Sequence, residues 1–159
     1  MKVLRDKDNL YVRVESLYPS KHPEDMDKLA PDGNIFTQDY VELGLSPPGG
    51  GAKVYRLAAN PVEGSRYDSV LAPGKPEDAQ WNGRWEYGCR TSGIKGRYSL
   101  PGRTCTAWFK IPFADFQAKA PAARDVWGFN ARRNRGARSL VWSDAKGATD
   151  PEALGKLAF

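Results

Sequence analysis

The sequence contains few of the residues from which catalytic and redox centres are usually built. Its 159 residues include one histidine, His22, together with two cysteines and two methionines. A lone histidine in a polar loop is more often solvated than a general base, and no GxSxG, HExxH or phosphate-cradling glycine motif is present. With only His22, Met1 and Met26 available as axial ligands, we expect no haem.

Long apolar runs are also absent. No segment approaches the roughly 20 apolar residues that cross a bilayer, and residues 1–6 lack the apolar core of a signal peptide. We therefore expect no membrane partner. The missing leader does not by itself indicate a cytoplasmic protein, because leaders are removed from mature chains.

The chain has a net charge of +5, and positive charge is concentrated in one segment. Arginines gather at Arg132, Arg133, Arg135 and Arg138. Such a cluster can bind an anionic polymer. The favoured interpretation is a solvated loop whose arginines pair with Asp and Glu, because acidic residues are interspersed and no nucleic-acid motif occurs. We expect no nucleic-acid partner.

The two cysteines, Cys89 and Cys105, are too far apart for a CxxC motif and too few for a zinc site. A turn-like stretch between them separates two strand-like runs, so the two residues could face each other across an antiparallel ladder. A cross-strand disulfide and two buried thiols are both open interpretations. A disulfide would place the protein in an oxidising compartment.

Turn residues and alternating strands dominate the rest of the chain. The 16 glycines and 12 prolines break it into short pieces. Alternation of apolar and polar residues predicts strands at 9–15, 40–45, 53–59, 85–89, 104–111, 126–131 and 139–142. Residues 112–119 suit a helical turn, and residues 19–34 a loop. Short strands at these intervals predict an all-β protein, an antiparallel β-sandwich of the jelly-roll or immunoglobulin-like kind.

Four tryptophans lie inside the predicted strands, and core packing is favoured for each: Trp85, Trp108, Trp127 and Trp142. Trp81 stands beside the turn signal Asn82-Gly83 and could be exposed.

Carboxylates offer two further kinds of site. Asp39 and Glu42 lie close together at a strand, and a glycosidase pair is not excluded by counting. Asp6 and Asp8 form half of an oxygen-ligand loop, without the Gly and Glu that complete an EF-hand. Asp144 and Asp150 could also supply oxygens. Bound structural calcium is therefore an open expectation.

Several short sequence blocks follow one another along the chain in a characteristic order. They include Gln38-Asp39-Tyr40-Val41-Glu42-Leu43, Trp127-Gly128-Phe129-Asn130 with Arg133-Asn134-Arg135, and Asp150-Pro151 with Gly155. That order resembles the family 9 carbohydrate-binding modules and their wider relatives, from about Lys2 to Phe159. The resemblance implies a single β-sandwich domain over residues 1–159, a non-catalytic role and, in some members, bound calcium. Such modules normally carry an additional N-terminal stretch with an early strand, which this chain lacks.

Family 9 modules hold the end of a glucan or xylan chain between two aromatic rings. By position, the resemblance makes Phe36 the first ring, Glu42 a hydroxyl-binding carboxylate and Arg56 its neighbour on the next strand. Arg132 stands where a Gln is typical, and Ala148 and Thr149 stand where the second ring would be. We add Trp142, from the same C-terminal block, to the candidate ligand-binding residues. The alternative is a structural Glu42–Arg56 ion pair with nothing bound.

The sequence therefore predicts a non-catalytic module that binds plant-type polysaccharide and targets a polysaccharide-degrading system, as part of a larger multidomain enzyme. The resemblance places such a protein outside the cytoplasm, secreted or periplasmic. Two alternatives remain: a small glycoside-active enzyme using Asp39 and Glu42, and a binding domain for an acidic sugar, whose carboxylate Arg can bind in a bidentate way.

Overall fold

The structure, a computed structural model, describes residues 1–18, 28–49, 52–60, 65–93, 103–116, 118–135, 138–143, 149–150 and 154–159. Strands dominate these ranges, and helix occurs there only as two 3-10 turns, η2 (Ile35–Thr37) and η3 (Phe113–Phe116). The second lies within the predicted helical turn. None of the helices found in these ranges is long and apolar enough to span a membrane.

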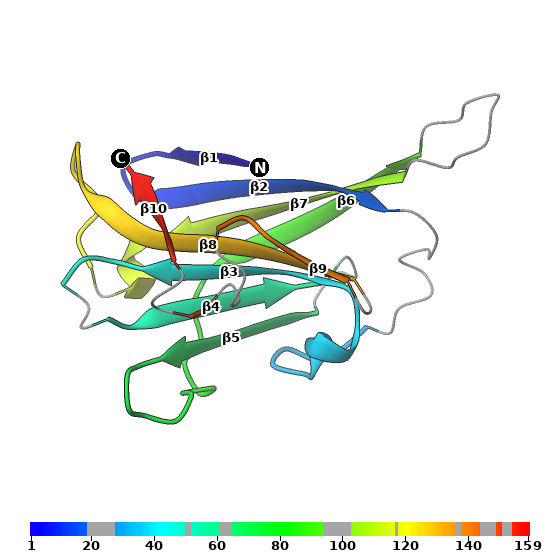
Figure 1. The fold of residues 1–159 in the computed structure, drawn as a ribbon, viewed down its shortest axis with the longest axis horizontal. Coiled ribbons are helices and arrows are strands. Elements are labelled where there is room, and N and C mark those ends of the chain that lie inside the picture. The colour runs from blue at the N-terminus through cyan, green and yellow to red at the C-terminus, as the bar shows by residue number, and fades with distance from the viewer. Residues whose placement is uncertain are drawn as a thin grey trace.

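Two antiparallel sheets face each other (Figure 1). The four-stranded sheet has the order β1 (Lys2–Arg5), β2 (Asn9–Tyr18), β7 (Arg103–Pro112), β6 (Glu86–Gly93). The six-stranded sheet has the order β10 (Gly155–Ala158), β8 (Val126–Arg135), β3 (Tyr40–Ser46), β4 (Val54–Ala59), β5 (Arg66–Leu71), with β9 (Arg138–Val141) also paired to β8. The predicted all-β sandwich is confirmed.

The core lies between the sheets and follows the period of two along each strand. Leu10 and Val12 of β2, Phe109 of β7, and Leu43 and Leu45 of β3 all point into it. Residues between these positions face outward. This alternation is why the predicted strands match the observed ones.

The tryptophans divide into two kinds. Trp85 and Trp127 are buried in the core, as predicted. The prediction of core packing is wrong for Trp108 and Trp142, which are 47% and 51% exposed. Trp108 occupies an outward position of β7, and Trp142 follows the end of β9. Trp81 is half-buried and packs its ring against Tyr55, 5.1 Å between centroids.

One edge of β8 is shared by two partners. β10 pairs with the first part of β8, and β9 pairs with the last part. Between them, the backbone N–H of Trp142 donates to the carbonyl of Ala131 over 2.8 Å. Trp142 is thereby fixed at the margin of the sandwich rather than inside it.

Three short strands have no clear sequence signal: β1, β5 and β10. β1 and β10 have four residues each, too few to show a period. In β5, the carboxylate of Asp68 faces the interior and Ser69 is buried on the other face. Polar side chains on both faces hide the alternation on which a strand prediction depends.

The predicted disulfide does not form, and Cys89 and Cys105 are free thiols. In the β6–β7 ladder Cys89 is opposite Ala107, and Cys105 is opposite Thr91. The cysteines are therefore diagonal neighbours on one face, two residues out of register. Their sulfurs lie 2.7 Å apart as hydrogen-bonded thiols. The alternative of two thiols is the one observed.

Candidate functional site

The structure brings four of the five predicted ligand-binding residues to one place, the outer face of the six-stranded sheet. Leu43 and Leu45 of β3 face the core, so Glu42 faces outward. The ladders place Glu42 opposite Arg132 of β8, and Arg56 of β4 opposite Gly44 of β3. Phe36 comes from the 3-10 turn η2, just before β3.

An ionic network joins these residues. Nε of Arg56 donates to Oε1 of Glu42 over 2.6 Å, and Nη1 of Arg132 lies 3.9 Å from Oε2. Arg56 also donates through Nη1 to Oε1 of Glu77, 3.1 Å away. The ion pair between Glu42 and Arg56, predicted as an alternative to ligand binding, is therefore present.

Glu77 extends the network beyond β5. Its Oε1 accepts hydrogen bonds from the hydroxyls of Tyr67 and Ser69 as well as from Arg56. Burial alone would raise the pKa of Glu77, but the hydrogen bonds from Ser69, Arg56 and Tyr67 outweigh it, and the pKa is lowered. Glu77 is thus held as a carboxylate.

The ring of Phe36 is half-buried within a small apolar cluster on this face. It meets Tyr40 and Tyr67 edge-on, with centroids 5.1 and 4.9 Å away. The guanidinium carbon of Arg56 lies 4.3 Å from the ring centroid, a cation–π contact. Arg56 is therefore enclosed between an aromatic ring and the carboxylate of Glu42.

Glu42 is the most deeply placed charge of the network. Its side chain is 1% exposed, and Oε2 has no hydrogen-bond partner among the described residues. A buried acceptor without a donor costs about 1–3 kcal/mol. Above it lies the guanidinium of Arg132, whose side chain is 30% exposed and also donates to Ser139 Oγ over 2.7 Å.

Trp142 does not join this group. Its ring packs against Phe129, 5.5 Å between centroids, at the margin between the sheets. There it lines a groove of about 590 Å³ together with Val14, Arg132 and Leu140. Ala148, which stands where the family resemblance predicts the second ring, lies outside the described residues, as do His22, Asp144 and Pro151.

Asp39 and Glu42 have different ion-pair partners. Asp39 lies 3.6 Å from Arg133, whereas Glu42 is bound by Arg56 on the outer face. Arg133 is buried and donates to the carbonyl of Tyr40 and to Ser16 Oγ of the other sheet. The two carboxylates thus serve different networks.

The arginine cluster is not a loop, contrary to the prediction. Arg132, Arg133 and Arg135 belong to β8, and Arg138 begins β9. The predicted pairing with acidic residues is confirmed for Arg132 with Glu42 and for Arg133 with Asp39.

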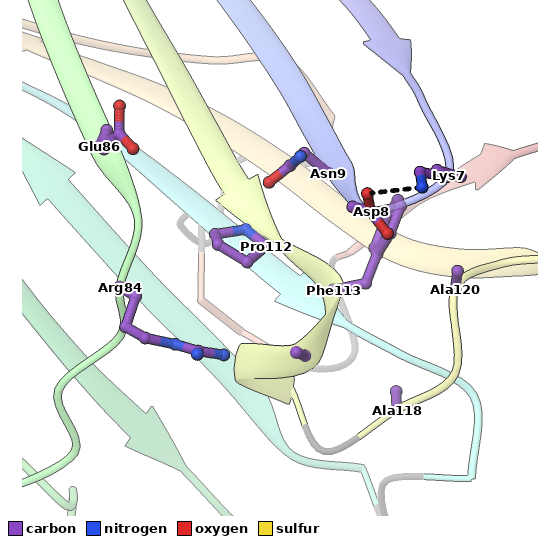
Figure 2. Close-up of a pocket in the computed structure, with 10 residues that line it drawn as sticks. Lys7, Asp8, Asn9, Arg84, Glu86, Pro112, Phe113, Ala118 and Ala120 are labelled. Carbon is purple, nitrogen blue, oxygen red and sulfur yellow. Dashed lines mark ion pairs between the residues drawn. The ribbon is translucent and has the colours of Figure 1, made fainter.

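In the turn from Asp6 to Asn9, both carboxyl oxygens of Asp6 accept hydrogen bonds from the protein itself. Oδ1 of Asp6 accepts the backbone N–H groups of Asp8 and Asn9, and Oδ2 accepts the hydroxyl of Tyr11. Figure 2 shows Asp8 beside Lys7, an ion pair of 3.7 Å on the wall of a cavity of about 560 Å³. No group of three or more His, Cys, Asp or Glu suited to a metal occurs in the described part of the chain.

Sequence reasoning missed the residues that β5 and the following segment contribute to the site: Tyr67, Ser69 and Glu77. Their placement depends on the register of β5, in which Ser69 is opposite Arg56 and Tyr67 opposite Ala58. Because β5 itself lacked a strand signal, no pattern in the sequence could have found them.

Comparison with protein-family models gives no match, and comparison with curated proteins gives none either. Among solved structures, the chain is similar to a protein of Bacteroides uniformis provisionally assigned as carbohydrate-binding. The two share 15% sequence identity with a TM-score of 0.60, over 95% of this chain and 72% of that one. At that identity the likeness establishes a shared fold.

Proposed function

We propose that this protein is a non-catalytic carbohydrate-binding module, whose ligand lies on the outer face of the six-stranded sheet. The observation that carries the proposal is the setting of Glu42. Its carboxylate lies between two guanidinium groups, one of which packs on the ring of Phe36, and one of its oxygens has no donor among the described residues. The shared fold with a protein provisionally assigned to carbohydrate binding supports it.

A sugar hydroxyl both donates and accepts, so it suits a site that mixes carboxylate and guanidinium groups. A hydroxyl placed at Oε2 of Glu42 would supply the donor that this oxygen lacks. Arg132 lies above Oε2, so its side chain has to move aside for the sugar to enter. The exposed edges of Phe36 and Tyr67 would border the apolar face of the ring.

The charge of the site favours a neutral sugar over an acidic one. Two carboxylates, Glu42 and Glu77, balance two guanidinium groups, Arg56 and Arg132. Binding a sugar carboxylate would add a third negative charge to a network already in balance, and removing charges from water is costly when they are not paired. The acidic sugar is the second candidate, tested by the same measurement.

The finer assignment follows from the order of sequence blocks. We place the chain near the family 9 modules, acting on glucan or xylan chains for a polysaccharide-degrading system outside the cytoplasm. The family's second ring is replaced by Ala148, so only one aromatic side of the site remains. A single ring provides less stacking area, and the affinity should be correspondingly lower than with two.

Affinity electrophoresis on neutral and acidic polysaccharides tests the proposal. We expect retention on a neutral glucan or xylan, and a loss of about tenfold in Phe36→Ala and Glu42→Gln. Val126→Ala, which removes an exposed apolar side chain elsewhere on the six-stranded sheet, is the matched control and should bind as the wild type does. Wild-type protein that is retained on no glycan would overturn the proposal. Retention on acidic glycans alone would favour the second candidate.

A further inference from the structure

The outer face of the four-stranded sheet carries a large exposed ring that no part of the proposed site uses. Ala107 and Phe109 of β7 point into the core, so Trp108 between them points outward and is 47% exposed. A tryptophan in the middle of a sheet, on its central strand pair, is an unusual residue to leave in water.

The backbone beneath Trp108 is shaped to receive its ring. Trp108 is opposite Gly88 of β6, and a Cβ atom added at Gly88 would overlap Cζ2 and Cε2 of the indole. The ring therefore lies down on the sheet over a residue without a side chain. One indole face is supported by the backbone of Gly88, and the other is turned to solvent.

The residues around the ring form a regular frame given by the strand register. On β2 the outward positions are Tyr11, Arg13 and Glu15; on β7 they are Thr106 and Lys110 beside Trp108; on β6 they are Glu86 and Arg90 beside Gly88. With adjacent strands about 4.8 Å apart, three strands make a platform about 10 Å wide.

Charges on this platform are largely paired. Nη2 of Arg13 lies 2.9 Å from Oε2 of Glu15, and Nζ of Lys110 lies 3.1 Å from Oε1 of Glu86. Each pair has no net charge but keeps hydrogen-bond donors and acceptors at the surface. A partner complementary to this frame is polar and uncharged, with an apolar face to set against the ring.

We infer that the Trp108 platform is a second glycan-binding surface, which takes a neutral polysaccharide chain lying across β2, β7 and β6. The C–H groups of one sugar stack on the electron-rich face of the indole. Hydroxyls at the rim of that sugar exchange hydrogen bonds with the Arg13–Glu15 and Lys110–Glu86 pairs. An anionic polymer gains less here, because Arg13 and Lys110 are already neutralised by their carboxylate neighbours.

The inference does not require the proposed site, because the two surfaces lie on the outer faces of different sheets and share no residue. Either can fail alone. Variants of Trp108 and Gly88 report on the platform, and variants of Phe36 and Glu42 report on the other face.

Depletion isotherms on insoluble cellulose and insoluble xylan test the inference with the whole chain. Trp108→Ala should weaken binding about tenfold. Gly88→Ala should do the same with the ring still present, because the new methyl group lifts the indole off the sheet. Leu4→Ala, which removes another exposed apolar side chain from the same sheet, is the control and should bind normally. Unchanged thermal unfolding midpoints show that each variant is folded.

Two outcomes support the inference. In the first, Trp108→Ala and Gly88→Ala lose affinity for the polysaccharide and Phe36→Ala does not. In the second, the variants of both surfaces lose affinity, because both surfaces contribute to adsorption. Wild-type affinity in Trp108→Ala and Gly88→Ala on both polysaccharides overturns it, whatever the Phe36 variant does. A change of oligomeric state in Trp108→Ala, measured by light scattering, would instead make this face a contact between copies and would also overturn it.

Discussion

Arg56 donates to Glu42 across 2.6 Å while its other side is covered by the ring of Phe36. The side chain of Glu42 is 1% exposed and that of Arg56 is 18% exposed. Removing one member of such a pair is costly, because the charge that remains has little water around it and keeps only one other ion-pair partner.

Removing Arg56 should therefore cost much stability. We expect Arg56→Ala to lower the free energy of unfolding by about 3–5 kcal/mol, since it leaves Glu42 with Arg132 alone. Urea denaturation measures the loss. Arg132→Ala takes a guanidinium from the same carboxylate, but one that is 3.9 Å away and 30% exposed. It should cost no more than about 1 kcal/mol. Equal losses in the two variants would contradict the arrangement described.

Ionisation of one buried group, Asp68, should lower the free energy of unfolding as the pH rises. Burial raises the pKa of Asp68, against hydrogen bonds from the indole N–H of Trp85 and the backbone N–H of Gly83, which lower it. Its Oδ1 has no hydrogen-bond partner among the described residues, so only Oδ2 is stabilised by donors. The stabilising contribution is complete below the unfolded pKa, near 3.8, and is lost as the pH rises through the folded pKa.

Comparison with Asp68→Asn isolates this effect. The free energy of unfolding of the wild type, measured relative to Asp68→Asn at the same pH, should decline from pH 4 towards neutrality. The amide can still accept from Trp85 and Gly83 but does not ionise. A difference between the two proteins that is constant over this range would show that Asp68 ionises as readily in the folded state as in the unfolded state.

The thiols of Cys89 and Cys105 should be slow to react in the folded protein. The hydrogen bond to Cys105 and burial both raise the pKa of Cys89, so little thiolate is available there at pH 8. The same hydrogen bond lowers the pKa of Cys105, but that thiol is buried and is shielded from the reagent. We expect an aromatic disulfide reagent to label both cysteines only after unfolding, without prior reduction. Fewer than two thiols in unreduced, denatured protein would contradict the free thiols of this structure.

The carboxyl of Asp6 should titrate far below an ordinary aspartate. Hydrogen bonds from Tyr11 and from the backbone of Asp8 and Asn9 lower its pKa to about 2. Its contribution to stability is therefore present above the unfolded pKa and is lost as the pH falls towards 2. Carbon NMR of the side-chain carboxyl follows this titration. Because both carboxyl oxygens already accept hydrogen bonds, we expect millimolar calcium to leave the signal in place, and a shift with calcium would argue for a metal at this turn.

The sandwich was predictable because seven strands alternate clearly, and the positions of Glu42, Arg56 and Arg132 followed from alternation combined with the family resemblance. The strands that escaped prediction are those whose sequence carries no period. β5 keeps the carboxyl group of Asp68 inside because Gly83 and Trp85, just before β6, donate hydrogen bonds to it, a contact that no local pattern reveals.

The fate of the tryptophans shows the same limit. The sequence predicts a strand at both Trp85 and Trp108, yet Trp85 is buried and Trp108 lies on the surface. What separates them is the parity of each position relative to the core and, for Trp108, the glycine on the neighbouring strand. The side of a strand that faces the core depends on the partner sheet, so a single strand's sequence does not decide it.

The two sheets of the sandwich turn their outer faces in opposite directions. A protein that bound sugar through both faces would not bind a single polysaccharide chain more tightly, because one chain cannot lie along both faces at once. It would join two polysaccharide chains instead. Such a molecule would act as a crosslinker. A solution of soluble glycan would thicken or precipitate when protein binding sites and polysaccharide chains are mixed in about equal numbers.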